Sequence, residues 1–281
     1  MKLQAIHLVK AMGLASGWSI STLSLNGFHS TSQEKRKQVK TYSFLTLNPK
    51  IMNLYFSSLT LAASFLACAY LTFKSFSPPN PVPTSTWPKD TIMRYQTPLQ
   101  RHTFLATLLF GWFYYIILIL FPPASPSFTC PQPEHIETKF FTWSAYTGFY
   151  IALLFIAAPI RLLAYRQLGK SFTFELAKPR ELVKTGMYAY VRHPSYPTLL
   201  ACYIGTGALT LRWGGVIGCW LPAWLVQWRV LDLGGQVGVA MLFTWVLGLR
   251  VKEEEEMLKA EFGREWEEYA GRTKMFLPGI F

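Results

Sequence analysis

Two stretches of this chain of 281 residues contain the residue types that bind charged ligands. The first runs from Leu182 to Tyr196 and contains lysine, arginine, histidine and three tyrosines between two apolar stretches. The second begins at Arg250 and includes four consecutive glutamates, residues 253–256. Arginine binds carboxylates through paired hydrogen bonds, and glutamate accepts hydrogen bonds from hydroxyl and amino groups. If the two stretches meet in space, they can enclose a ligand that carries both kinds of group.

Taken alone, the first stretch also fits the edge of a membrane helix. Pro194 suits a first helical position, and tyrosines are typical of the membrane interface. Arg192 could extend its charge toward the headgroups. The first stretch therefore does not by itself distinguish a binding site from a membrane boundary.

The glutamate run is more informative because its helical register can be worked out. At about 100° per residue, one helical face carries five apolar residues: Val251, Leu258, Phe262, Trp266 and Tyr269. Glu254 and Glu255 interrupt this face, whereas Glu253 and Glu256 project to the far side. An unpaired buried carboxylate costs several kcal/mol, so the inner pair needs partners. The register makes Glu254 and Glu255 the functional candidates and Arg250, one turn earlier, their nearest cationic partner.

Together the two stretches resemble the isoprenylcysteine carboxyl methyltransferases. The resemblance covers residues from about Arg161 to Phe281 and rests on two ordered motifs: Gly186-x-Tyr188-x-x-x-Arg192-His193-Pro194-Ser195-Tyr196, and Arg250-x-x-x-Glu254-Glu255-x-x-Leu258-x-x-x-Phe262-Gly263-x-Glu265-Trp266-x-x-Tyr269. It implies S-adenosyl-L-methionine as cofactor and the carboxylate of a C-terminal prenylated cysteine as acceptor. It also implies catalytic roles for Arg192, Arg250 and Glu255, and cofactor binding by Leu182, Val183, Gly186, Tyr188, His193, Pro194, Tyr196 and Glu254.

The implied chemistry places few demands on the protein beyond positioning. A carboxylate acceptor is already anionic at neutral pH, so no metal is implied and His193 need not act as a general base. Three other functions stay open: a membrane lipid-amine methyltransferase, an NADPH-dependent enzyme like the sterol reductases, and a non-catalytic membrane scaffold. The string Arg192-His193-Pro194-Ser195-Tyr196 argues against the reductase, and two carboxylates on a packed face argue against the scaffold.

Composition predicts an all-α, polytopic integral membrane bundle, and the resemblance implies a cytosol-facing C-terminal catalytic region. Hydrophobic residues make up 51% of the chain and charged residues 15%. We expect a basic, Ser/Thr-rich tail over residues 1–48, which is most simply read as disordered, three transmembrane helices over 49–160, and a membrane-embedded methyltransferase region over 161–281. The interval between the motifs is long and rich in glycine, which suggests an added membrane segment or a re-entrant turn. An even number of crossings must separate the motifs, because both have to lie on one side.

The net charge of +12 is explained by topology better than by nucleic acid. The basic residues flank the apolar segments and form no stripe with stacking aromatics. The segment 161–192 carries a strong basic excess, which predicts that it faces the cytosol. The resemblance implies a multi-pass protein of the endoplasmic reticulum membrane. The spacing of the four cysteines supports neither a zinc site nor a disulfide framework. The expected partners are the lipid bilayer and a prenylated protein or prenylcysteine.

Overall fold

The computed structural model describes residues 49–81, 87–88, 90, 97–179, 181–277 and 279. The predicted tail over residues 1–48 lies outside this part of the chain. Residues 59–281 form one compact unit, which contains every residue of the predicted site, and residues 1–58 form another. Of the first unit, only the start of helix α2 is described.

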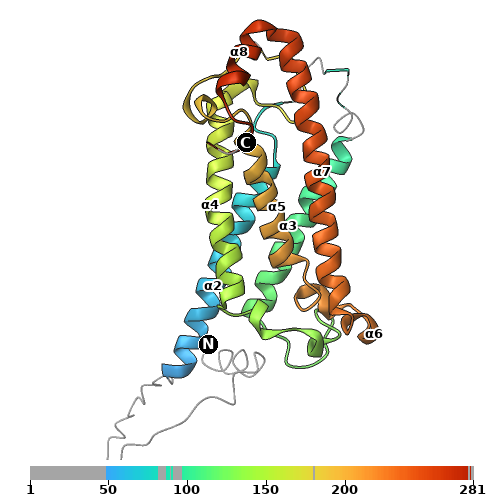
Figure 1. The fold of residues 1–281 in the computed structure, drawn as a ribbon. Coiled ribbons are helices and arrows are strands. Elements are labelled where there is room, and N and C mark those ends of the chain that lie inside the picture. The colour runs from blue at the N-terminus through green and yellow to red at the C-terminus, as the bar shows by residue number, and fades with distance from the viewer. Residues whose placement is uncertain are drawn as a thin grey trace, which may run out of the picture. The chain divides into compact units, whose positions relative to one another are not determined.

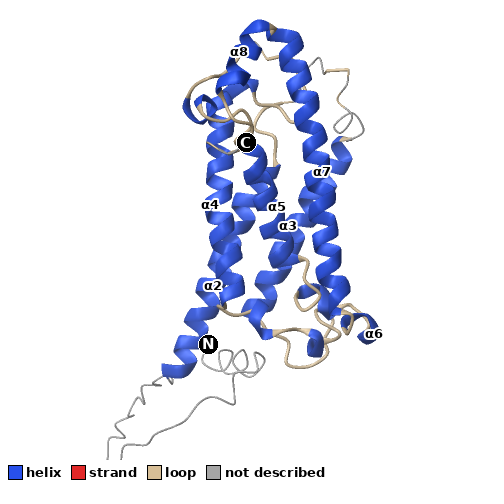
Figure 2. Cartoon of the chain, in the orientation of Figure 1, coloured by secondary structure: helices blue, strands red, loops and turns tan. Residues whose placement is uncertain are grey.

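Within the described residues the regular structure is helical, apart from one isolated β-bridge. The long helices are α2 (Pro49–Phe76), α3 (Pro98–Leu120), α4 (Ala145–Leu168), α5 (Ser195–Thr210) and α7 (Arg229–Phe262), followed by the short α8 (Arg264–Arg272) (Figures 1 and 2). In the described part of the chain, four helical segments are long and apolar enough to cross a membrane: 52–76, 98–120, 138–171 and 230–262. The prediction of a polytopic helical membrane protein is confirmed.

Local sequence explains where two of these helices begin. Thr97 and Ser144 each cap a helix by accepting a hydrogen bond from the backbone N–H three residues on, at Gln100 and Thr147. In both cases the side chain of that third residue bonds back to the cap, which completes a capping box. Helix α3 ends at Leu120, shortly before two prolines that cannot continue it.

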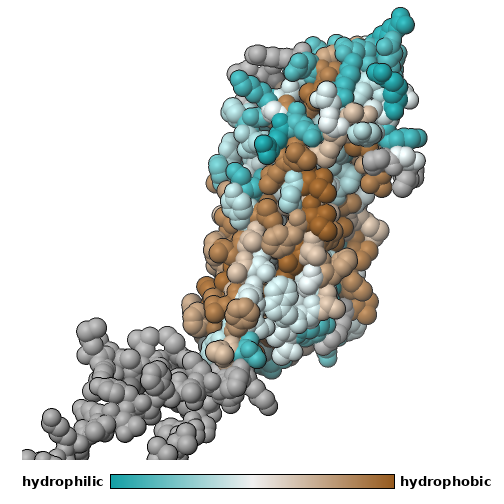
Figure 3. All heavy atoms as spheres, turned by 90° about the vertical axis from the view of Figure 1, so that its left-hand side faces the viewer, coloured by the Kyte–Doolittle hydropathy of each residue, from teal (hydrophilic) through white to brown (hydrophobic). Residues whose placement is uncertain are grey.

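The helices bury aromatic side chains against one another and leave apolar side chains facing outward. Phe65 of α2 packs edge-on against Trp112 of α3 with ring centroids 5.4 Å apart, and all of its surface is buried. The outer surface over the middle of the helices is largely hydrophobic, whereas hydrophilic residues gather at the end that carries α8 (Figures 1 and 3). An apolar outer band of this kind is what a bilayer requires of a spanning bundle.

The long interval between the motifs contains two long helices, α5 and α7, of which only the α7 segment 230–262 is a candidate membrane span. The expected even number of crossings therefore stays a prediction. α5 has 16 residues, and at 1.5 Å per residue it rises only about 24 Å. Residues 213–228 add no further crossing helix. They form the 3₁₀ turn η7 (Val216–Cys219) and the one-turn helix α6 (Ala223–Val226), at the end of the bundle away from α8 (Figure 1).

The absence of a disulfide framework, inferred from the cysteine spacing, is wrong. Cys130 and Cys219, which are 89 residues apart, form a disulfide. It ties the α3–α4 connection to the turn η7, alongside backbone hydrogen bonds from Gln132 N to Cys219 O (3.2 Å) and from Glu137 N to Gly214 O (2.9 Å). Spacing gave no sign of this pair because the two cysteines meet only when antiparallel helices bring two distant loops to the same end. Cys68 and Cys202 are buried and free.

Candidate active site

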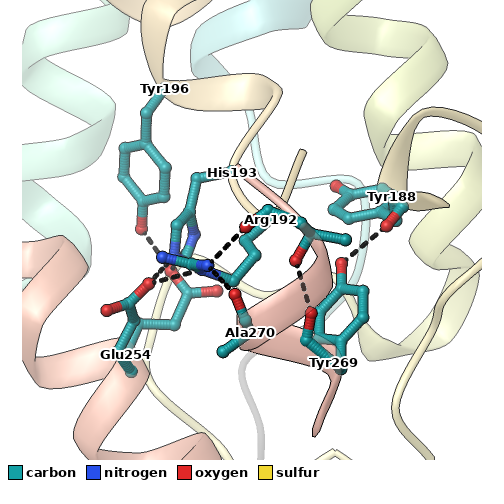
Figure 4. A network of polar contacts seen from close by, with 9 residues as sticks. Tyr188, Arg192, His193, Tyr196, Glu254, Tyr269 and Ala270 are labelled. Carbon is teal, nitrogen blue, oxygen red and sulfur yellow. Dashed lines mark hydrogen bonds and ion pairs between the residues drawn. The ribbon is translucent and has the colours of Figure 1, made fainter. Parts of the chain in front are cut away.

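The second motif meets the first through the two inner glutamates. The Tyr196 hydroxyl donates a hydrogen bond to Glu254 Oε2 over 2.7 Å, and His193 Nδ1 lies 3.7 Å from the same oxygen (Figure 4). Glu255 Oε1 accepts from Arg192 Nε at 2.9 Å and lies 3.3 Å from His193 Nε2. The helical register predicts that Glu254 and Glu255 lie on the packed face, and the structure brings both to the first motif, while Glu256 is exposed.

The apolar face that led to this register does not continue along one helix, which corrects the expectation. Helix α7 ends at Phe262, and Gly263 adopts a positive φ of 53°, a backbone conformation that residues other than glycine rarely adopt. The chain then turns into α8, which returns Trp266 and Tyr269 to the buried region from another direction. Trp266 and Tyr269 are buried as expected. They are buried because the chain turns at Gly263, and not because a single helix continues with the same periodicity.

Tyr269 connects α8 to the first motif. Its hydroxyl donates a hydrogen bond to the Tyr188 carbonyl oxygen over 2.7 Å (Figure 4). Burial raises the pKa of Tyr269 to about 12, although the nearby Arg192 guanidinium acts to lower it. Burial and the neighbouring Glu254 carboxylate also raise the pKa of Tyr188. Both phenols therefore remain neutral hydrogen-bonding groups at physiological pH.

Arg192 fastens the C-terminal segment to the site. Its guanidinium donates to Glu255 and, through Nη1, to the carbonyl oxygens of Ala270 (2.7 Å) and Thr273 (2.8 Å) (Figure 4). The backbone N–H of Arg192 also donates to Lys274 O over 2.8 Å. These contacts place the first motif and the C-terminal segment at the same end of the bundle. The role of Arg192 in them is mainly structural, because it holds the two segments together.

Arg250 forms an ion pair with a residue that the sequence did not indicate as its partner. The expected partner was Glu254, one turn along α7, but the structure pairs Arg250 Nη1 with Asp90 Oδ1 at 2.8 Å. Arg250 Nη2 also donates to the carbonyl oxygen of Phe174. Asp90 belongs to the α2–α3 connection, far from either motif in sequence, so no local pattern could have revealed the pair.

A cavity of about 380 Å³ lies where these elements meet. One part is lined by charged and polar side chains, including Arg161, Arg192, His193, Tyr196, Arg250 and Glu254. The other part is apolar and lies along α3, α5 and α7, with Phe104, Leu199, Tyr203, Phe243, Val246 and Leu247. Tyr203 and Phe243 stack there at 4.1 Å between ring centroids. The cavity thus has a polar part and an apolar part, which fits an amphiphilic ligand.

Most of the predicted site residues line this cavity, namely Leu182, Val183, Tyr188, Arg192, His193, Tyr196, Arg250 and Glu254. Gly186, Pro194 and Glu255 are not among the lining residues. Gly186 has a φ of 63°, and a Cβ there would lie 2.7 Å from the side chain of Gln167, so the turn requires glycine. Pro194 is buried as the N-cap of α5, and Glu255 contacts Arg192 and His193 from outside the cavity.

Arg161 is a cavity residue that the sequence analysis treated only as a topology signal. It lies near the end of α4 with 4% of its surface exposed. Nε donates to Ser75 O over 3.0 Å and Nη1 to Ser195 O over 2.8 Å. Within the described residues no carboxylate lies within ion-pair distance of it. A buried cation without an anion is costly, so Arg161 favours an anionic ligand in the cavity. Its place at the end of an apolar segment was the available signal.

Comparison with known proteins agrees with this geometry. Residues 150–232 match the model of the isoprenylcysteine carboxyl methyltransferase (ICMT) family. The chain is 28% identical over 148 residues to the "Probable protein-S-isoprenylcysteine O-methyltransferase" of Oryza sativa subsp. indica. The aligned region covers 51% of this chain and 66% of that protein. It is 29% identical over 144 residues to the "Protein-S-isoprenylcysteine O-methyltransferase" of Schizosaccharomyces pombe, covering 50% and 52%.

A third relative is the "Protein-S-isoprenylcysteine O-methyltransferase B" of Arabidopsis thaliana, 28% identical over 138 residues, with 48% of this chain and 60% of that protein covered. The chain therefore spans less than two thirds of the length of each of these relatives. The family match contains the first motif and ends before the second, which begins at Arg250. Residues 150–232, less than half of the chain, are thus similar to the isoprenylcysteine carboxyl methyltransferase family.

Proposed function

We propose that this protein transfers a methyl group from S-adenosyl-L-methionine to the carboxylate of a C-terminal prenylated cysteine, as a protein-S-isoprenylcysteine O-methyltransferase of the endoplasmic reticulum membrane. The observation that supports this most is the two-part cavity. Its polar part carries arginines and a glutamate from both motifs, and its apolar part runs along membrane-spanning helices. An acceptor with a charged carboxylate and a lipid chain matches both parts at once.

The polar part fits the groups that the methyl donor presents. S-Adenosylmethionine, when bound, supplies a methyl group attached to a sulfonium sulfur. When the methyl group is transferred, this sulfur leaves as a neutral thioether. Glu254 offers carboxylate oxygens to its hydroxyl or amino groups and offsets positive charge. Tyr188 and Trp266 provide buried aromatic surface beside the cavity. The cavity of about 380 Å³ lies within the range of small-molecule sites.

Arg161 is the residue best placed to hold the acceptor carboxylate. Two of its hydrogen bonds go to carbonyl oxygens of α2 and α5, which fix the guanidinium without neutralising it. Ser75, one of those two residues, precedes Phe76, which lines the cavity and packs edge-on against Phe104. A carboxylate on Arg161 would therefore lie beside aromatic surface suited to a lipid chain. Holding the nucleophile in line with the methyl group supplies most of the required catalysis.

Arg192 and Glu255 have a supporting role in this scheme. Their ion pair keeps α7, the start of α5 and the C-terminal segment in a fixed arrangement. No general base is required, because the acceptor carboxyl group has an ordinary pKa of about 3.3–3.7 and is ionised at neutral pH. Burial of the polar groups strengthens their electrostatic effect on the reacting charges.

The test is transfer of a labelled methyl group by the purified protein in detergent to a farnesylcysteine analogue. Transfer to the free carboxylate, with none to the matching carboxamide, is expected. S-Adenosylmethionine should also raise the thermal unfolding temperature, since a ligand that binds only the folded state stabilises it. Stabilisation by NADPH alone would favour a reductase, and transfer to a lipid amine in place of the carboxylate would favour a lipid-amine methyltransferase.

A further inference from the structure

The α2–α3 connection reaches the site from outside both motifs and outside the matched residues 150–232. Asp90, in this connection, has 4% of its surface exposed, and its partner Arg250 has 6% exposed. Asp90 Oδ1 lies 2.8 Å from Arg250 Nη1, and Asp90 Oδ2 accepts a hydrogen bond from the backbone N–H of Leu176 over 2.7 Å. The two oxygens of one carboxylate thus join Arg250 to the segment around Leu176.

The same segment holds Arg250 from a second side. The Phe174 carbonyl oxygen accepts a hydrogen bond from Arg250 Nη2. Further contacts bind the α2–α3 connection and the start of α3 to this segment: Trp87 N donates to Leu176 O over 2.6 Å, and Arg101 pairs with Glu175 at 2.5 Å. The guanidinium of Arg250 is therefore fixed by an ion pair with Asp90 and a hydrogen bond to Phe174 O, and both partners are themselves held in place.

We propose that Asp90 is a positioning residue that acts through Arg250, an inference that rests on the proposed methyl transfer. Arg250 lines the cavity, whereas Asp90 is not among the lining residues. Glu254 lies one turn along α7 from Arg250 and would attract the guanidinium if Asp90 were absent. Asp90 thus holds Arg250 toward the cavity and leaves the Glu254 carboxylate available to the ligand.

The variant Asp90→Asn tests this by removing charge while keeping the side chain's shape. We expect kcat/KM for the acceptor to fall roughly tenfold to a hundredfold, which is the scale of losing a correctly oriented group. The matched control is Glu261→Gln, which breaks an ion pair of 2.7 Å between α7 and Lys178 outside the cavity and should leave kcat/KM unchanged. An Asp90→Asn protein that matches the wild type would overturn the proposal.

A second arm asks whether Asp90 acts through Arg250. Affinity for S-adenosylhomocysteine is measured by calorimetry in the wild type, Asp90→Asn, Arg250→Gln and the double variant. Asp90→Asn should weaken binding in the wild-type background and have little further effect once Arg250 is replaced, since directly contacting residues are not additive. Equal losses in both backgrounds would show an independent structural effect and would overturn the proposal.

Misfolding and failure of the proposed function are separable from this result. If Asp90→Asn does not yield folded protein, Asp90→Glu keeps the charge and shifts it by one methylene. A lower kcat with an unchanged unfolding temperature then supports positioning, and an unchanged kcat opposes it. A folded wild type that neither transfers methyl groups nor binds S-adenosylhomocysteine overturns the proposed function, and the role of Asp90 with it. An active wild type with an unaffected Asp90→Asn variant overturns the role of Asp90 alone.

Discussion

Tyr196, in the first turn of α5, donates a hydrogen bond to Glu254 of α7 over 2.7 Å. The two residues are 58 positions apart, and the turn η7 and the helix α6 lie between them in sequence. Their contact joins the two motifs directly and orients the Glu254 carboxylate beside the cavity. Substituting each glutamate of residues 253–256 in turn therefore tests whether the four have different roles.

Glu254→Gln should reduce methyl transfer by about 10²- to 10³-fold, the scale of losing one oriented electrostatic group. Glu255→Gln should also reduce it sharply, because it weakens the contacts to Arg192 and His193. Glu253→Gln and Glu256→Gln should remain near wild type, because charges on the outer side of the helix are screened. Initial rates and cofactor affinity of the four purified proteins provide the comparison. Equal losses in all four would contradict the assignment of the inner pair.

Arg161→Lys should lower transfer strongly even though it keeps the charge. Lysine lacks the planar guanidinium that donates to Ser75 O and Ser195 O and still faces the cavity. Each lost hydrogen bond from a charged group costs about 1.5–3 kcal/mol, so the unfolding temperature should fall as well. Arg166→Lys, on the exposed side of the same helix, is the matched control. If both variants transfer methyl groups at the wild-type rate, Arg161 does not hold the acceptor.

Replacing Cys130 and Cys219 with serine should destabilise the protein by about 2–5 kcal/mol without removing the site. The bond can be counted by alkylating the unfolded protein and measuring its mass. Without reductant only the two free thiols, Cys68 and Cys202, should react, whereas after reduction all four cysteines should. Alkylation of four cysteines without reductant would mean that the disulfide does not form.

The end that carries the disulfide should face the oxidising lumen, and the site the cytosol. Two matched tripeptides allow a test, since residues 127–129 and 171–173 both read Ser-Phe-Thr. Ser127→Asn and Ser171→Asn each create the same glycosylation acceptor, at opposite ends of α4. A glycan is expected on the first variant only. A glycan on the Ser171→Asn variant alone would show that the protein has the opposite orientation in the membrane.

Tyr269→Phe should destabilise the protein by about 1 kcal/mol, because it removes the hydrogen bond to Tyr188 O. The pKa of Tyr269 is raised to about 12 in the folded protein, above its usual value of about 10. The neutral phenol therefore contributes its stability fully below pH 10, and this contribution is lost as the pH rises toward 12. Unfolding temperatures of both proteins between pH 7 and pH 11 should converge at the alkaline end. A difference that stays constant over this range would contradict the assignment.

Local pattern in the sequence was enough to predict the helical membrane fold, the two motifs and the position of Glu254 and Glu255 on the packed face of their helix. These features depend on apolar length and on helical periodicity, which are properties of neighbouring residues. The even number of crossings between the motifs stays a prediction, because among the described residues only one candidate span, 230–262, begins between them.

Only the tertiary structure decided which distant residues meet. The pairing of Arg250 with Asp90, the hydrogen bonds of Arg161 and the Cys130–Cys219 bond each join segments that lie far apart along the chain. The turn at Gly263 also required the folded chain, because it breaks a periodicity that reads as continuous. The physical reason is that partner choice for a buried charge or thiol depends on which loops the packed helices bring together, and helical periodicity carries no information about that.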